Sequence, residues 1–382
     1  MKPHGWKKLT AMLLCFAVLL SLLPIGTLQA SAYSETDIAY PVEGGNIYFG
    51  KDLGIITGAD ETITSADIPA EIDGVAVTRI GDNAFYGCDS LTSVTIPDSV
   101  TTIGGYAFSF CASLTSVTIG DIVTIGGSVT TIGEYAFEYC DSLTSVTIGD
   151  SVTTIGYGAF YSCDSLTSVT IPDSVTTIGE YAFEYCDSLT SVTIGDSVTT
   201  IGYSAFQGTA YYRDERNWEN DVLYVGKHLI EARYSISGEY IVRNNTLTIA
   251  DRAFYSCDSL TSVIIPDSVT SIGYGAFSYC DSLTGIWVDE SNQYYSSDEY
   301  GILFNKSKTE LIQCPDSYSG EYTIPDSVTS IGDRAFFSCV SLTSVTIGDS
   351  VTSIGDWAFE YCTSLMSVTI GDSVTSIGDY AF

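Results

Sequence analysis

The 382-residue chain carries 47 acidic and 14 basic residues, which give it a formal net charge of −33. A charge of this size repels nucleic acid and anionic lipid headgroups and attracts cations and basic partners. We therefore expect no nucleic-acid partner, although the acidic residues could also serve only as solubilising turn residues. The length alone suggests two or three globular domains, but that expectation fails for a repeat array, in which each repeat contacts only its neighbours.

Residues 1–32 are interpreted as a secretory signal peptide. Three lysines precede an apolar run at residues 9–23, and the small residues Ala30–Ala32 provide a cleavage site after Ala32. A membrane anchor is the alternative, but the run is short for a span of about 20 residues. Because no second apolar run follows, we expect no membrane span in the mature chain, which is secreted or held at the cell surface. Loss of the three lysines leaves 11 basic against 47 acidic residues, a net charge of −36.

Residues 33–79 lead into a repeated motif and are predicted to form a hairpin and a capping repeat. Two short apolar runs within residues 45–59 flank a polar turn that contains a lysine, which is the pattern of a β-hairpin. Ile63, Ala66 and Ile68 then take the three apolar positions of the repeat. A cap at this point covers the edge of the first turn, which would otherwise be exposed.

From residue 80 onwards the chain repeats the motif I-G-x-x-A-F, in most cases every 23 residues. A fixed period in this range indicates a solenoid. One variant copy replaces the glycine by alanine at Ala250. The copies begin at Ile80, Ile103, Ile132, Ile155, Ile178, Ile201, Ile249, Ile272, Ile331, Ile354 and Ile377.

Each repeat also contains L-x-x-V-x-I, as at Leu143, Val146 and Ile148. Its period of two is typical of a strand with one buried face. A Gly or Pro followed by Asp-Ser predicts a turn, and V-T-x-I-G predicts a second, shorter strand. The A-F pair is expected to point inward from a tight, 3₁₀-like segment that Cys closes. We predict roughly twelve such turns, stacked about 4.8 Å apart.

Two inserts interrupt the period, at residues 209–248 and 285–330. Each has two apolar runs around a polar turn that contains lysine, and is therefore predicted to form a β-hairpin. Each also ends in a degenerate repeat that stays in register, so that Tyr240 and Tyr322 take the position of Val146. The uninterrupted repeats occupy residues 80–208, 249–284 and 331–382.

Two further irregularities concern the regular repeats. The stretch Ile119–Gly133 holds six extra residues, which duplicate the V-T-I-G element and are expected to form a bulging loop. The sequence stops at Phe382, in the middle of a repeat, where an open last strand would be an aggregation hazard. We therefore expect that the chain is a fragment of a longer protein or the product of a truncated reading frame.

The full repeat, C-x-S-L-T-S-V-T-I-P/G-D-S-V-T-S/T-I-G-x-x-A-F, resembles the BspA-like, or treponemal-type, leucine-rich repeats over nearly all of Tyr33–Phe382. The resemblance implies a curved, predominantly β solenoid with the L-x-x-V-x-I strands parallel on its concave face. It also implies an extracellular or cell-surface protein of a host-associated microbe that adheres to matrix proteins or to other cells. The family offers no catalytic residues to map onto this sequence.

Histidine, which many catalytic sites need, is nearly missing from the mature chain. Its one histidine, His228, lies in the polar turn of the first insert and is expected to be exposed. Because serine and cysteine nucleophiles need an imidazole close by, we predict that the chain is not an enzyme. The G-x-G at Gly156–Gly158 recurs at Gly273–Gly275 within the repeat and is a turn rather than a phosphate-binding loop.

Ten cysteines remain after cleavage, nine of them in one position of the repeat. Secretion and an even count favour disulfides, but stacked equivalent positions point the same way, which favours buried thiols that act as small hydrophobic groups. A ladder of one cysteine per turn does not supply converging metal ligands. The nine are Cys88, Cys111, Cys140, Cys163, Cys186, Cys257, Cys280, Cys339 and Cys362, and the tenth is Cys314.

Aspartates recur in two ladders that could coordinate Ca²⁺, but Asp beside Ser is ordinary turn chemistry and no calcium-loop spacing is present. We expect no metal and no cofactor. The ladders consist of Asp141, Asp164 and Asp187, and of Asp150, Asp173 and Asp196.

The outward strand positions hold Ser and Thr in almost every repeat, as at Ser145 and Thr147. Because specific recognition normally uses varied side chains, the regular repeats are interpreted as a scaffold or a multivalent hydroxyl surface. The exceptions are Gly285 in place of Ser, and Ile264 and Trp287 in place of Thr. The inserts also hold exposed-looking aromatic residues, which are typical anchors for protein or sugar partners but could instead pack the hairpins onto the solenoid. The candidate binding residues are Tyr211, Tyr212, Trp218, Trp287, Tyr294 and Tyr295.

The sequence therefore predicts a non-enzymatic adhesion protein whose partner is an extracellular protein or a glycan. Binding is expected to concentrate at Tyr211–Asn220 and Trp287–Tyr300. One alternative is an accessory module of a larger secreted protein or enzyme that continues beyond Phe382. Another is a regular Ser/Thr array that binds an ordered surface such as a glycan lattice or ice.

Overall fold

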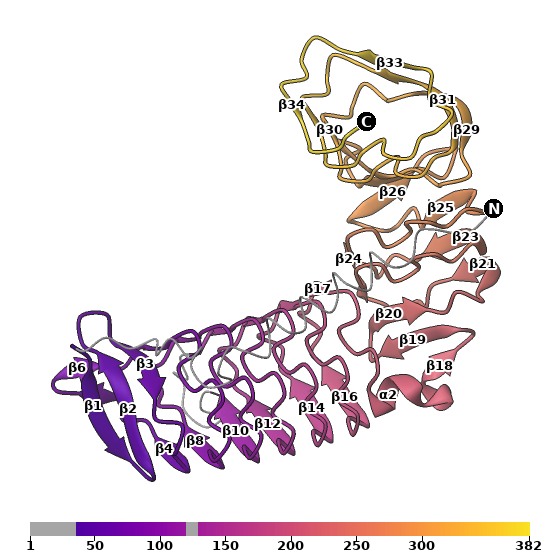
Figure 1. Cartoon of the computed structure of the whole chain (residues 1–382). Helices are drawn as coiled ribbons and strands as arrows, with labels where there is room; N and C mark the ends of the chain where they lie inside the picture. Colours follow the sequence, from indigo (N-terminus) through magenta and orange to yellow (C-terminus); the bar gives the residue numbers. More distant parts are fainter. Residues whose placement is uncertain (1–35, 120–128) are drawn as a thin grey trace, which may run out of the picture.

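The computed structural model describes residues 36–119 and 129–382. The predicted signal peptide with its cleavage site lies outside the described residues, and so does most of the predicted bulging loop. The described chain is a β-solenoid of about 14 turns with parallel strands, which confirms the predicted leucine-rich-repeat solenoid (Figure 1). Within this part of the chain, the helical elements are a single α-turn, α2 (Ala210–Arg213), and a 3₁₀ turn, η1 (Glu215–Asn217).

Each regular turn contributes one longer strand, whose Val and Ile side chains enter the core while Ser and Thr face outward. The longer strands pair in parallel and in register, for example Val117 with Val146. They form three separate sheets along the solenoid. The strands are β4 (Ser65–Asp67), β8 (Ser93–Thr95), β10 (Ser116–Ile119), β12 (Ser145–Ile148), β14 (Ser168–Ile171) and β16 (Ser191–Ile194); β21 (Ser237–Ile241), β23 (Ser259–Ile265) and β25 (Gly285–Val288); and β29 (Ser319–Thr323), β31 (Ser341–Ile347) and β33 (Ser367–Ile370).

The second, shorter strand of each turn has only two residues and ends at the Ile of the motif. These strands also stack in parallel, as Ile132 with Ile155. They are β7 (Arg79–Ile80), β9 (Thr102–Ile103), β11 (Thr131–Ile132), β13 (Thr154–Ile155), β15 (Thr177–Ile178) and β17 (Thr200–Ile201), then β22 (Thr248–Ile249) and β24 (Ser271–Ile272), and finally β30 (Ser330–Ile331), β32 (Ser353–Ile354) and β34 (Ser376–Ile377).

Stacked phenylalanines run through the centre of the solenoid. The rings of Phe108 and Phe137 lie 5.1 Å apart at an angle of 5°, and those of Phe137 and Phe160 lie 5.2 Å apart at 4°. All three are fully buried. Because burying one such side chain contributes about 1.5–3 kcal/mol and each turn covers only its neighbours, stability comes from contacts between adjacent turns.

The segment that carries Ala and Phe is a run of turns rather than a 3₁₀ helix, because the residue directly before Ala and the second residue after Phe are left-handed. Tyr135 has φ 52° and Tyr139 has φ 53°. The N–H groups of Tyr135, Phe137 and Tyr139 donate to carbonyls of the next turn, at 2.7, 2.8 and 2.9 Å. The N–H groups between them bond locally, as Glu138 N to Tyr135 O at 3.1 Å. All inter-turn donors of this segment therefore point toward the C-terminal side.

The solenoid consists of three runs of turns, and each run opens with a three-stranded antiparallel meander instead of a two-stranded hairpin. The last strand of each meander pairs in parallel with the first short strand of its run, so that Ile56, Leu229 and Leu311 take the position of the motif Ile. These three strands and the eleven motif copies account for the about 14 turns, where roughly twelve were predicted. The meanders are β1 (Ile38–Val42), β2 (Gly45–Gly50) and β3 (Ile55–Ala59); β18 (Trp218–Glu219), β19 (Val222–Val225) and β20 (His228–Ala232); and β26 (Tyr295–Ser297), β27 (Leu303–Asn305) and β28 (Glu310–Gln313).

After each meander, the degenerate repeat takes the position that the sequence predicts. Tyr240 pairs with Val263, and Tyr322 pairs with Val345. At the N-terminal end, Ala66 pairs with Val94 in the same position, and a small hairpin of β5 (Glu71–Ile72) and β6 (Val75–Ala76) follows. The degenerate repeats thus restart the long-strand sheets of the second and third runs.

The solenoid bends at both inserts, where the sheets of one run end and those of the next begin (Figure 1). At the first junction, Asp251 N donates to Ile201 O at 2.9 Å, and Thr248 Oγ1 donates to Val198 O at 2.7 Å. The hydrophobic core continues across this junction. At the second junction a separate core begins, which includes Phe304 and Phe336.

Deleting residues 155–177 is expected to leave a folded protein of lower stability. The deletion joins Thr154 to Ile178, so that the two-residue strand Thr-Ile is restored and the neighbouring turns can stack. Thermal unfolding should remain cooperative, with Tm lower by about 2–4 °C for each kcal/mol lost. Deleting residues 155–166 instead is the matched control: it breaks the period and should give an unfolded or aggregated chain. An equal loss of structure in both variants would show that the turns are not interchangeable.

Candidate binding surfaces

The three aromatic candidates of the first insert pack against the solenoid. Tyr211 Oη donates to Tyr224 O at 2.9 Å, and Tyr212 Oη donates to Glu231 Oε1 at 2.8 Å. The indole N–H of Trp218 donates to Tyr212 O at 2.7 Å, and the Arg233 guanidinium lies 4.3 Å from its ring centroid. All three are half-buried against the core. Their geometry matches the packing alternative, in which the aromatic rings hold the insert on the solenoid.

The candidates of the second insert divide into one half-buried and two exposed residues. Tyr295 is half-buried, and its hydroxyl accepts from Ile272 N at 3.0 Å across the second junction. Trp287 is 38% exposed and Tyr294 is 52% exposed. They lie on different sheets, because Trp287 belongs to β25 while Tyr294 directly precedes β26. The structure therefore does not bring the six candidates together into one site.

Trp287 is the end of a row of exposed apolar side chains on the middle long-strand sheet. Ile241 pairs with Ile264, and Ile264 pairs with Trp287, in direct register across β21, β23 and β25. Ile241 is 60% exposed and Ile264 is half-buried. In the regular turns this position holds Thr, as at Thr147 and Thr170. We call Ile241, Ile264 and Trp287 the apolar row.

Ile241 was missed in the sequence, although a signal was available. Tyr240 takes the Val position of the repeat, so the next residue takes the outward Thr position. A register shift between Gly238 and Glu239 displaces the earlier part of β21 and obscures the match. Counting forward from Tyr240 rather than backward would have found it.

Gly285 is explained by the position of the Trp287 ring. An ideal Cβ on Gly285 would lie 2.5 Å from Trp287 Nε1, so a serine at this position would collide with the indole. Gly301, at φ +72°, approaches from the next segment, where its own Cβ would lie 2.5 Å from Gly285 Cα. The indole therefore occupies the space that a side chain at Gly285 would need.

The outward face of the regular turns is uniform. Thr118 and Thr170 are exposed, and no side-chain hydrogen bond within the described chain occupies their hydroxyls. A second row of threonines is used internally, since Thr115 Oγ1 donates to Thr92 O at 3.2 Å and Thr144 Oγ1 donates to Thr115 O at 3.0 Å. Equal hydroxyls on every turn can discriminate little between partners.

His228 is buried, and the expectation of an exposed histidine was wrong. Its side chain is 0% exposed, because β20 is covered by the last turn of the first run. Burial lowers the pKa of the imidazole, which is neutral at pH 7. The adjacent Lys227 forms an ion pair with Asp196 of that last turn. His228 thus belongs to the buried first junction.

The cysteines occupy the core, where their thiols bond to the preceding turn. Cys140 Sγ donates to Phe108 O at 3.2 Å, and Cys163 Sγ donates to Phe137 O at 3.1 Å. Such S–H donors are weak, but each thiol donates to a buried carbonyl oxygen that already accepts one backbone N–H, and so uses its second lone pair. Nine of the ten are buried and Cys362 is half-buried. Burial raises the pKa of the Cys88 and Cys257 thiols to about 12, which keeps them protonated and unreactive at neutral pH.

The aspartates of the turns bond to backbone groups of the following turn. Asp173 Oδ1 accepts from Asp196 N at 2.9 Å, and Asp82 Oδ1 accepts from Gly105 N at 2.9 Å. Over residues 36–119 and 129–382, no group of three or more His, Cys, Asp or Glu side chains is arranged to hold a metal ion. None of the helices described there is long and apolar enough to cross a membrane.

Comparisons with known proteins agree with the repeat architecture. The family described as a BspA type leucine rich repeat region (6 copies) matches residues 60–128, 78–211, 121–237, 234–319 and 315–382. The comparison with curated proteins gave no match. A leucine rich cell surface protein from Faecalibacterium prausnitzii, of known structure, is 33% identical over 92% of this chain and 81% of that one, with a TM-score of 0.41.

Two further solved structures are similar. A leucine-rich repeat protein from Eubacterium ventriosum is 24% identical over 90% of this chain and 68% of that one, with a TM-score of 0.38. A leucine-rich repeat protein of T. pallidum is 26% identical over 64% of this chain and 91% of that one, with a TM-score of 0.41.

The ten cysteines of the mature chain are expected to be reduced and protected. Alkylation of the native protein at neutral pH should modify few of them within minutes, because the thiols are buried and protonated, and alkylation after denaturation should modify all ten. Mass spectrometry counts the adducts in both states. A low count after denaturation without reductant would show that disulfides are present.

Proposed function

The chain belongs to the BspA-type leucine-rich repeat family, and we propose that it is a secreted or cell-surface protein that binds an extracellular protein without catalysing a reaction. The observation that supports a binding role is the apolar row, because it interrupts an otherwise uniform Ser/Thr face. The similarity to a cell surface protein of Faecalibacterium prausnitzii supports the location.

The apolar row has the composition of a binding centre. An aromatic side chain flanked by aliphatic ones can be desolvated by a partner, and such anchors often contribute 2 kcal/mol or more when truncation is measured. Glu239, which pairs with Ser262, adds a carboxylate to the neighbouring row, and Ser262 Oγ donates to Glu239 Oε2 at 3.4 Å. With a net charge of −33 on the whole chain, the matching surface of the partner is expected to carry an apolar centre and basic side chains.

The absence of catalysis is part of the proposal. The only histidine of the described chain is buried at the first junction. The purified chain should show no turnover of peptide, ester or glycoside substrates above the rate without protein. Substrate turnover that co-purifies with the chain, and that is lost when an exposed residue is substituted, would contradict the proposed absence of catalysis.

Replacing Trp287 and Ile241 by Ala is expected to weaken binding to a matrix protein. Loss of one anchor of about 2 kcal/mol corresponds to a roughly 30-fold higher Kd. Surface plasmon resonance against a panel of immobilised matrix proteins measures the change, and circular dichroism checks that each variant is folded.

Two controls decide where binding occurs. Thr147→Ala with Thr170→Ala truncates the same position on the regular face, and Tyr294→Ala truncates an exposed aromatic outside the apolar row. Both should bind like the wild type. If the threonine pair abolishes binding and the Trp287 pair does not, the regular face is the binding surface and the assignment to the apolar row is wrong.

A further inference from the structure

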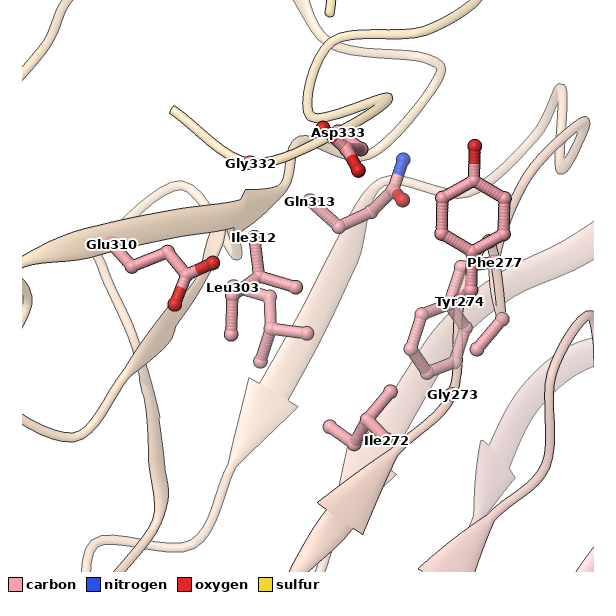
Figure 2. Close-up of a pocket in the computed structure, with 12 residues that line it drawn as sticks. Ile272, Gly273, Tyr274, Phe277, Leu303, Glu310, Ile312, Gln313, Gly332 and Asp333 are labelled. Atoms are coloured by element: carbon pink, nitrogen blue, oxygen red, sulfur yellow. The ribbon is translucent and has the colours of Figure 1, made fainter. Parts of the chain in front are cut away.

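A pocket of about 200 Å³ lies at the second junction, between the last turn of the second run and the meander that opens the third. Ile272, Tyr274 and Phe277 form one side (Figure 2). The other side is formed by residues of β27, β28 and the turn after β30, among them Leu303, Gln313 and Asp333. None of the expected partner residues in the inserts lines it, so it is separate from the apolar row.

The pocket exists because the backbone ladder is interrupted. In the preceding turn, Arg252 N donates to Tyr274 O at 2.9 Å and Phe254 N donates to Ala276 O at 2.7 Å. The equivalent donors of the next turn are the N–H groups of Gly275 and Phe277, and neither has an acceptor within the described chain. They point to the side where a further turn would stack, and that side is the pocket. The pocket thus offers two parallel backbone donors.

Side chains from the third run supply acceptors and an amide opposite these donors. Gln313 is only 5% exposed, and its amide nitrogen donates to Cys314 O at 3.2 Å, which leaves its oxygen available. Asp333 uses Oδ1 to accept from Asp356 N at 2.8 Å, which leaves Oδ2. Glu310 lies on the opposite side of the pocket from Tyr274 (Figure 2). Polar groups therefore meet over a floor of aliphatic side chains.

The charge of the pocket disfavours strongly charged ligands. The carboxylates of Glu310 and Asp333 repel an anion. A cation is already present at the rim, because Arg334 Nε donates to the Tyr274 hydroxyl at 2.6 Å and its guanidinium lies 5.2 Å from that ring centroid. This guanidinium offsets part of the negative charge of the two carboxylates, so a cation gains less from them. The mixture of backbone donors and side-chain acceptors suits a neutral ligand with several hydrogen-bonding groups.

From these observations, we propose that the pocket binds one neutral sugar residue at the end or branch of a glycan. The volume is below the usual range of about 300–1,000 Å³ for drug-sized ligands, so that only a group as small as one sugar ring fits. Hydroxyls of the sugar donate to Asp333 and Glu310 and accept from the backbone donors, while its C–H groups contact the aliphatic side chains. Acidic sugars are excluded by the carboxylates.

Gly275→Tyr tests the proposal by placing a bulky side chain on a residue that lines the pocket. Gly275 has φ +59°, and the same position of other turns holds Tyr135 at φ 52° and Trp357 at φ 53°, so the backbone accepts an aromatic residue. An ideal Cβ would lie 3.1 Å from the rotatable Ser278 Oγ and 3.8 Å from Arg252 Cγ. Gly87→Tyr is the matched control, because it introduces the same side chain at φ +68° with no atom within 4 Å, far from the pocket.

The measurement is saturation-transfer NMR and titration with methyl glucoside, galactoside, mannoside and N-acetylglucosaminide at millimolar concentrations. We expect binding of at least one of them by the wild type and Gly87→Tyr, and about tenfold or greater weakening in Gly275→Tyr. Failure of every neutral sugar to bind, or binding that Gly275→Tyr leaves unchanged, would overturn the proposal. So would preferential binding of glucuronate or of a lysine-rich peptide. Binding to a matrix protein through the apolar row does not depend on this pocket, so each proposal can fail without the other.

Discussion

The stacking of backbone N–H and C=O groups between successive turns is the constraint on which the rest of the structure depends. A turn of 23 residues is too small to bury its own Leu, Val, Ile and Phe, and it can do so only when the next turn presents matching groups at the same height. This requirement fixes the period, and it also fixes the left-handed conformation of residues such as Tyr135, whose N–H must reach the next turn. Each side chain then repeats directly above its equivalent, and rings, thiols and hydroxyls form continuous rows.

The same constraint explains why much of the fold was predictable. Period-two patterns located the long strands, and a fixed spacing of residues placed Tyr240 and Tyr322 in the Val position even though their repeats are degenerate. The sequence did not predict contacts between segments that are distant in the chain. The sequence pattern places His228 in a polar turn, and only the packing of the first junction shows that His228 begins β20 and is covered by the preceding run. The third strand of each meander pairs with the first short strand of its run although it contains no I-G motif. Leu229, for example, pairs with Ile249.

The candidate site was predictable only in part, for a related reason. Aromatic residues in an irregular segment serve either as exposed anchors or as packing groups, and composition does not distinguish the two. A hydrogen bond and an edge-to-face ring contact at 5.2 Å identify Tyr212 and Trp218 as packing groups, and a sequence pattern reports neither contact. The apolar row depends on three strands in register, so it becomes visible only when residues that lie 23 apart are aligned on one face. The pocket lies where the ladder of inter-turn backbone hydrogen bonds stops. The ladder stops there because the solenoid bends between the second and third runs.

The uniform direction of the inter-turn donors has an electrostatic consequence. Along the edge that carries Ala and Phe, each turn contributes peptide groups whose N–H points toward the C-terminal side and whose C=O points back, so their dipoles add as they do in an α-helix. The sense is reversed relative to a helix, since the partial positive charge gathers where a run ends rather than where it begins. At the end of the second run, the buried carboxylate of Asp316 accepts from Cys280 N at 2.8 Å. Burial raises the pKa of Asp316 to about 7, but the backbone N–H groups of Cys280 and Tyr279 at this end lower that pKa in part, as the N–H groups of a helix N-terminus would.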